Sequence, residues 1–143
     1  MADIDSVVAT CCAIKARIVE QDEFDTGLRM LLNFGHTLGH AVEQHFGYSC
    51  FTHGEGVAIG MYQLTKRTEE LGMTAKGSAE RIKSVLEKYN LPLTAGVEKS
   101  QLLDTMARDK KKNGNSITLI ILQQIGEGVL QKVDWQEVPK YLG

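Results

Sequence analysis

The sequence predicts a mainly α-helical, multihelical domain with one small β-hairpin near the C-terminus. Apolar residues recur at helical spacing over most of the chain, and the clearest β-branched run lies near its end, beside a glycine-containing turn. A length of 143 residues suits one domain with a core of its own and is hardly enough for two. We therefore expect residues 1–143 to form a single domain.

Composition and charge narrow the classes of protein to consider. Hydrophobic residues make up 43% of the chain and charged residues 24%, as in ordinary globular domains. A formal net charge of −2 gives no reason to expect nucleic acid or an anionic membrane as partner. The sequence shows neither a run of membrane-spanning length nor a signal-peptide pattern. Cys11, Cys12 and Cys50 are odd in number and lack Cys-x-x-Cys spacing, which favours reduced thiols and a cytoplasmic protein.

The first predicted helix covers residues 3–20. Its apolar positions have the spacing of an amphipathic helix: Ile4, Val7, Val8, Cys11, Cys12, Ile18 and Val19. This stripe begins almost at Met1, which suggests that the chain was cut from a longer protein. Lys15 lies off the stripe, and from the pattern alone it is a solvated lysine.

An acidic segment at residues 20–25 should end this helix and lead into a second one, because acidic side chains suit a helix N-terminus. The second helix is expected to end at Gly47. Its apolar stripe comprises Leu28, Leu31, Leu32, Leu38, Val42 and Phe46. Asp25, Arg29 and Asn33 follow one another at intervals of four, so they are predicted to share the opposite face.

Further helices are predicted at residues 54–71, 78–89 and 100–112. Gly72 should stop the first of these, and Ser100 should cap the last. The expected core positions in the first two are Val57, Met61, Leu64, Leu71, Ala79, Ile82, Val85 and Leu86.

The chain should close with a β-hairpin and a short helix. Residues 117–122 and 129–133 read as strands, and the Gly-Glu-Gly sequence at 126–128 as their turn. Asp134 and Glu137 have the spacing of a capping box for the last helix. The sequence contains no Gly-x-Gly-x-x-Gly after a strand, and so no visible dinucleotide-binding fingerprint.

Three histidines are the main candidates for chemistry. His36 and His40 are four residues apart and would share one helix face, while His53 follows across a short loop. Gly35 and Gly39 remove side-chain bulk beside them, as a close approach by a ligand or another helix requires. The three imidazoles could converge on a metal with open positions, or they could be packed core residues. A zinc peptidase is disfavoured, because no glutamate follows the first histidine.

The motifs around these histidines resemble one enzyme family. The sequence reads NFGHTLGHAVE at residues 33–43 and HGEGVAIGM at 53–61, with IK at 14–15, GLR at 27–29 and DKK at 109–111. In this order they are similar to the C-terminal helical part of 3-dehydroquinate synthase. The resemblance implies that this chain is the second domain of such an enzyme and that the N-terminal NAD-binding domain is absent from it.

The family converts 3-deoxy-arabino-heptulosonate 7-phosphate to 3-dehydroquinate and phosphate, in the shikimate pathway of aromatic amino acid biosynthesis. The resemblance implies two cofactors: a divalent metal, zinc or alternatively cobalt, and NAD bound mainly by the N-terminal domain. It also implies a sugar-phosphate substrate and a homodimer for the full-length enzyme. This chain by itself is expected to be inactive.

The resemblance also assigns roles to residues. His36 and His53 correspond to metal ligands, and His40 to a proton-handling, substrate-contacting histidine. Catalytic roles fall on His40, Lys15 and Asp25, although the family has a glutamate at the position of Asp25. The implied substrate-binding residues are Lys15, Arg29, Asn33, His40, Lys110 and Lys111, with the choice between the last two left open.

The family's third metal ligand is a glutamate that belongs to a segment before Met1. Glu43 and Glu55 lie near the histidines in the sequence but do not match that position. We interpret Glu43 as a charge on the helix surface and Glu55 as a carboxylate in the first turn of its helix. Two other functions stay open: another sugar-phosphate cyclase on the same scaffold, and a non-catalytic helical module that binds metal or a partner.

Overall fold

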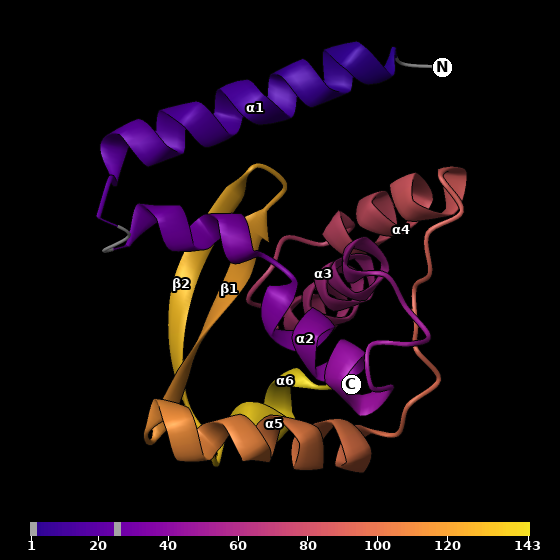
Figure 1. Ribbon diagram of the computed structural model, residues 1–143, viewed down its shortest axis with the longest axis vertical. Helices are drawn as coiled ribbons and strands as arrows, with labels where there is room; N and C mark the ends of the chain where they lie inside the picture. Colours follow the sequence, from indigo (N-terminus) through magenta and orange to yellow (C-terminus); the bar gives the residue numbers. More distant parts are fainter. Residues whose placement is uncertain (1–2, 25–26) are drawn as a thin grey trace.

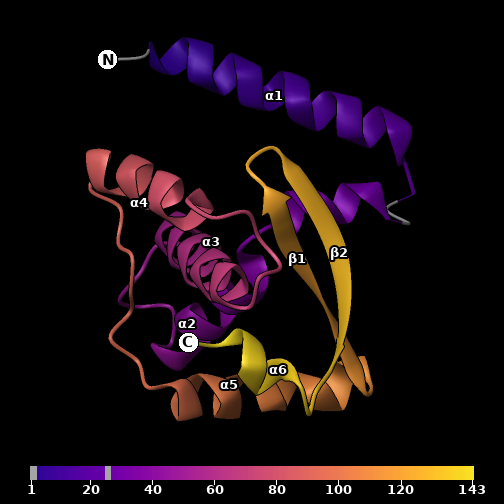
Figure 2. The same ribbon diagram turned by 180° about the vertical axis from the view of Figure 1, so that it is seen from behind.

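The computed structural model describes residues 3–24 and 27–143, without the side chains of residues 109–113. In chain order the elements are α1 (Ile4–Gln21), the 3₁₀-helix η1 (Leu28–Asn33), α2 (His36–His45), α3 (His53–Glu70), α4 (Ser78–Lys88), α5 (Lys99–Asn113), β1 (Ser116–Gln124), β2 (Glu127–Asp134) and α6 (Val138–Tyr141). Figures 1 and 2 show the hairpin beside the helices and α5 crossing its end. The mainly α-helical fold with one C-terminal hairpin is confirmed.

The hydrophobic core lies where α2, α3, α5, the hairpin and the C-terminal segment meet. Its buried residues are Leu38, Ala41, Leu64, Met106, Leu119, Ile121, Val133, Val138, Tyr141 and Leu142. Strands β1 and β2 pair antiparallel, with Ile117 opposite Val133, and Gly126 adopts a positive φ of 90° in the turn. The predicted hairpin is therefore present, and it places one apolar strand face against the helices.

The predicted second helix is interrupted. Residues from Leu28 to Asn33 form a 3₁₀-helix, and α2 begins anew at His36. Gly35 lies between them with a φ of 80°, a left-handed conformation that glycine adopts readily. The prediction of a single continuous helix was therefore wrong. Its predicted end was right, because Gly47 follows α2 with a φ of 60°.

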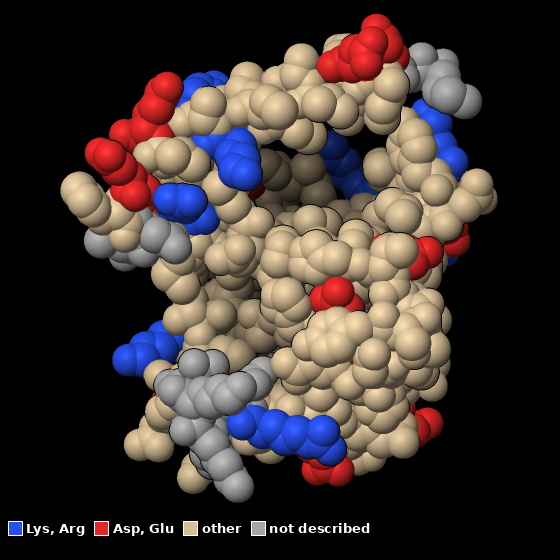
Figure 3. All heavy atoms as spheres, viewed as in Figure 1, with Lys and Arg blue, Asp and Glu red and all other residues tan. Residues whose placement is uncertain are grey.

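The first helix forms as predicted, but its apolar stripe does not enter the core. All of Ile4–Gln21 is described, and none of its residues is buried; Ile4 is 66% exposed and Val8 54%. Figures 1 and 2 show α1 extending beyond the rest of the fold, and Figure 3 shows a hollow beneath it. Among the helices that are described, none has the length and apolar character to cross a membrane.

Helix α3 and its stop at Gly72 agree with the prediction, but three local predictions are wrong. Helix α5 is capped by Glu98, which forms a capping box with Gln101 and displaces Ser100 from that role. Glu137 caps α6 without a side-chain hydrogen bond, so the predicted box with Asp134 does not form. Val85, expected in the core, is 56% exposed, because α4 turns its Ala79 and Leu86 inward instead.

Candidate metal and substrate site

The site is built where α2 and α3 cross at unusually short range. A Cβ atom on Gly39 would lie 2.8 Å from the carbonyl oxygen of Gly56. On Gly35 it would lie 2.7 Å from the carbonyl oxygen of Val57, and on Gly60 it would lie 2.9 Å from the amide nitrogen of Gly39. Real Cβ atoms do not approach this closely, so this crossing requires glycine at these positions. The prediction that Gly35 and Gly39 permit a close approach is confirmed.

This crossing brings together the three histidines singled out in the sequence. His36 and His40 come from α2, and His53 is the first residue of α3. The ring centroids are 5.8 Å apart for His36 and His40, 5.0 Å for His36 and His53, and 5.5 Å for His40 and His53. We call these three residues the histidine cluster.

Each ring of the histidine cluster is oriented through its Nδ1 atom. The Nδ1 of His36 lies 3.3 Å from the carbonyl oxygen of Phe34. The Nδ1 atoms of His40 and His53 lie 3.1 and 3.2 Å from the same carboxylate oxygen, Oε2 of Glu43. A carbonyl and a carboxylate accept hydrogen bonds, so each Nδ1 acts as the donor. No hydrogen bond between described residues involves the Nε2 atom of any of these three rings.

Glu43 is the partner that the sequence reading missed. We expected a charge on the helix surface, but its side chain is 8% exposed, whereas those of His40 and His53 are 53% and 54% exposed. The expectation was wrong because the short helix crossing covers this position. His40 and Glu43 are three residues apart, a spacing that places two helical side chains on one face, and this was the available signal.

Glu55 has the role that was predicted for it. Its carboxylate accepts hydrogen bonds from the backbone nitrogen and the hydroxyl of Thr52, at 2.8 and 2.9 Å, which completes a capping box at the start of α3. Both hydrogen bonds lower the pKa of Glu55, and the one from the Thr52 backbone has the larger effect. The carboxylate thus anchors the first turn of α3, which carries His53.

Arg29 and Asn33 lie in η1, directly before the histidine cluster. In a 3₁₀-helix residues three apart are aligned, so the predicted common face of these two residues does not hold. Arg29 is fixed through its backbone, whose nitrogen donates to Oδ2 of Asp22 at 2.9 Å. Its guanidinium is therefore not needed to hold the segment.

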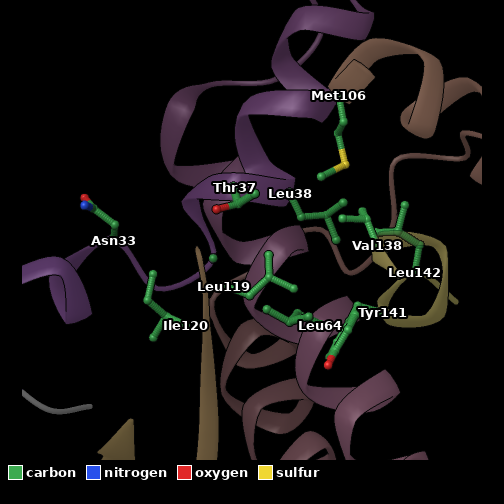
Figure 4. A pocket seen from close by; sticks show the side chains of 11 residues that line it. Asn33, Thr37, Leu38, Leu64, Met106, Leu119, Ile120, Val138, Tyr141 and Leu142 are labelled. Carbon is green, nitrogen blue, oxygen red and sulfur yellow. The ribbon is translucent and has the colours of Figure 1, made fainter. Parts of the chain in front are cut away.

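Asn33 also lines a small cavity whose other walls are mainly apolar, including Leu38, Leu64 and Leu119. Figure 4 shows its amide at the edge of this group, pointing away from the apolar side chains. The cavity measures about 10 Å³, room for one water at most. It is therefore a packing defect of the core and not a place for a sugar phosphate.

The remaining predicted residues are less closely joined to the site. Lys15 is exposed on α1, and no hydrogen bond or ion pair between described residues links it to the histidine cluster. Asp25 lies outside the described residues. Lys110 and Lys111 belong to α5, but their side chains are also outside the description. Their predicted roles therefore stay predictions.

The donor set fits a divalent transition metal. Possible ligand atoms of His40, Glu43 and His53, one from each side chain, all lie within 4.8 Å of one another, and the His36 ring adjoins the two other imidazoles. Imidazole and carboxylate groups suit zinc and cobalt. Half-exposed rings beside a buried carboxylate also leave room for a ligand on the solvent side. The arrangement could thus hold a metal and present it to a substrate oxygen.

Comparison with known proteins identifies the family. The sequence matches the family described as 3-dehydroquinate synthase C-terminal over residues 1–112. The chain belongs to this family. It is 47% identical to 3-dehydroquinate synthase of Clostridium acetobutylicum over 99% of its length, and 38% identical to that of Enterococcus faecalis over 99%. It spans 40% of the length of each of these relatives.

Solved structures share the fold of this 3-dehydroquinate synthase C-terminal domain. A 2-deoxy-scyllo-inosose synthase complexed with carbaglucose-6-phosphate, NAD⁺ and Co²⁺ is 19% identical, with a TM-score of 0.77, over 96% of this chain and 39% of that one. A 2-epi-5-epi-valiolone synthase from Streptomyces hygroscopicus, with NAD⁺ and Zn²⁺ bound, is 20% identical, with a TM-score of 0.70, over 87% of this chain and 35% of that one. At these identities the likeness concerns the fold.

Proposed function

We propose that this chain is the metal- and substrate-binding part of a 3-dehydroquinate synthase, which converts 3-deoxy-arabino-heptulosonate 7-phosphate to 3-dehydroquinate and phosphate. The supporting observation is that the family's histidine motifs form one cluster in a chain 47% identical to such an enzyme along nearly its whole length. The reaction is a carbon–oxygen lyase step of aromatic amino acid biosynthesis.

His36 and His53 are the proposed protein ligands for zinc, with cobalt as the alternative. The metal would polarise a hydroxyl or ketone oxygen of the substrate as a Lewis acid. The buried Glu43 orients His53 from behind, and the Phe34 carbonyl orients His36. NAD, the hydride acceptor, would be bound mainly by the part of the enzyme that lies outside this chain.

His40 is the proposed proton-handling residue. Its ring stands beside both ligand histidines, and imidazole is the side chain that most often serves as a general acid or base. Its Nδ1 already donates to Glu43, so the Nε2 atom is the one that can exchange a proton with substrate. Asp25 and Lys15 are proposed as further catalytic residues.

Anion recognition falls on the residues around η1 and on two lysines of α5. The Arg29 guanidinium offers a planar fork for phosphate or carboxylate, and Asn33 a hydrogen-bond donor. Lys15 and one of Lys110 and Lys111 would add point charges. We also propose that the full-length enzyme is a cytoplasmic homodimer.

A chimera tests the proposed reaction. This chain would replace the matching 40% of the Clostridium acetobutylicum enzyme, and dehydroquinate formation would be measured with NAD, zinc and the heptulosonate phosphate. We expect turnover by the chimera and none by the 143-residue chain without its partner domain. Turnover of sedoheptulose 7-phosphate in place of the heptulosonate would assign the chain to another cyclase. A folded, zinc-binding chimera inactive on both would refute the proposal.

Within that chimera, Arg29→Lys should raise KM for the heptulosonate phosphate about tenfold or more. A lysine is a point charge and cannot reproduce the two parallel hydrogen bonds of a guanidinium, each charge-assisted. The fold should be unaffected, because the contact of Arg29 with Asp22 runs through its backbone nitrogen. Arg81→Lys, the same exchange on the exposed surface of α4, is the control. Equal KM values for the two variants would remove Arg29 from the site.

A further inference from the structure

Glu43 is held in a position that the helix crossing creates. A Cβ on Gly56 would lie 3.1 Å from the carbonyl oxygen of Gly39 and 3.2 Å from Cγ of Glu43. The stem of Glu43 therefore passes directly over Gly56, one helical turn beyond His53 on α3. A larger residue at Gly56 would push the carboxylate away from the His53 ring. The same glycines that let the helices meet also let a residue of α2 reach the start of α3.

Burial of this carboxylate needs a compensating partner. The Glu43 residue is 6% exposed, and an ionised carboxylate removed from water without partners is strongly disfavoured. Its hydrogen-bond partners are the two imidazoles: Nδ1 of His40 at 3.1 Å, and Nδ1 of His53 at 3.3 Å from Oε1 and 3.2 Å from Oε2. One carboxylate thus joins two rings that belong to different helices.

The consequence is a defined tautomer for both rings. When Nδ1 carries the hydrogen and donates to Glu43, the lone pair of each neutral ring lies on Nε2. Both rings are about half exposed while Glu43 lies behind them, so these lone pairs are available on the open side of the site. A hydrogen bond of this kind fixes the orientation of a ligand histidine and raises its basicity.

We propose that Glu43 is a positioning residue that holds His40 and His53 in the Nδ1–H tautomer, so that His53 offers Nε2 to the metal and His40 offers Nε2 to the substrate. Glu43 itself stays out of the metal's coordination sphere. This inference rests on the proposed function, which supplies the metal and the substrate. In this proposal one carboxylate, that of Glu43, orients both the metal ligand His53 and the proton-handling residue His40.

The tautomers can be observed directly in the metal-free 143-residue chain. The ¹⁵N chemical shifts of the imidazole nitrogens distinguish Nδ1–H from Nε2–H. At pH 8 we expect Nδ1–H for both His40 and His53 in the wild type, and a mixture in Glu43→Gln. The control is Glu80→Gln, which removes a carboxylate on the exposed side of α4 that pairs with Lys83 of the same helix. Nε2–H tautomers in the wild type would overturn the proposal, whether or not any variant folds.

Zinc affinity gives the second readout. Glu43→Gln should weaken Zn²⁺ binding about 10–100-fold, the usual effect of losing an outer-shell partner, and Glu80→Gln should leave it unchanged. Bound Co²⁺ should show the same ligand-field spectrum in wild type and Glu43→Gln, because no ligand is lost. A changed coordination number would make Glu43 a direct ligand and contradict the proposal. Neither readout involves turnover, so an inactive chimera would refute the proposed reaction and leave this inference standing.

Discussion

Gly60→Ala is expected to lower the free energy of unfolding by about 3 kcal/mol, at the upper end of what overpacking a tight interior usually costs. A Cβ at this position would overlap the carbonyl oxygen of Gly35 and lie 2.9 Å from the amide nitrogen of Gly39. Both are backbone atoms and cannot rotate away as a side chain can. Helices α2 and α3 would have to separate, with loss of contacts along the whole crossing.

Urea unfolding followed by circular dichroism measures this effect. The matched control is Gly54→Ala in the same helix, where no described heavy atom lies within 4 Å of the added methyl group. Replacing an unstrained helical glycine by alanine is stabilising by roughly 0.5–1 kcal/mol. The two variants should therefore shift the transition in opposite directions. Equal stability of both would show that the close crossing is not a requirement of the fold.

The helix crossing illustrates how far local sequence patterns lead. The glycine before each histidine of α2 already predicted a close approach by a ligand or another helix, because glycine has no side chain. The break at Gly35 did not follow from the pattern. Its left-handed conformation is set by the fit of α2 against Val57 and Met61, which lie 22 and 26 residues further along the chain. Long-range packing of this kind leaves no mark on local periodicity.

The candidate site shows the same division. Motif spacing was enough to predict that His36, His40 and His53 lie close together, because two of them share a helix and the third is the first residue of the next helix. Glu43 was misplaced because charged residues are usually exposed, and only the helix crossing makes its position an interior one. Lys15 shows the reverse case, since nothing in its surroundings on α1 distinguishes it from a solvated lysine, and its assignment depends on family resemblance.

Loss of either proposed ligand, the imidazole of His36 or that of His53, should greatly weaken metal binding by this chain. We expect His36→Ala and His53→Ala each to weaken Zn²⁺ binding by more than the roughly 10–100-fold that an outer-shell partner contributes, because a ligand itself is lost. Both rings are partly exposed, and neither belongs to the hydrophobic core, so folding should be retained. Competition with a chromophoric chelator would measure the dissociation constants.

His45→Ala is the matched control for this experiment. His45 is the chain's fourth histidine and also lies on α2, but its ring packs on Phe46, with centroids 5.0 Å apart, outside the histidine cluster. It should bind zinc as the wild type does.

At a zinc concentration 100 times the wild-type dissociation constant, metal should raise the unfolding free energy of the wild type and of His45→Ala by about 2.7 kcal/mol. The same addition should leave His36→Ala and His53→Ala nearly unchanged. If His45→Ala lost zinc and the other two kept it, the metal site would have to be placed elsewhere on α2.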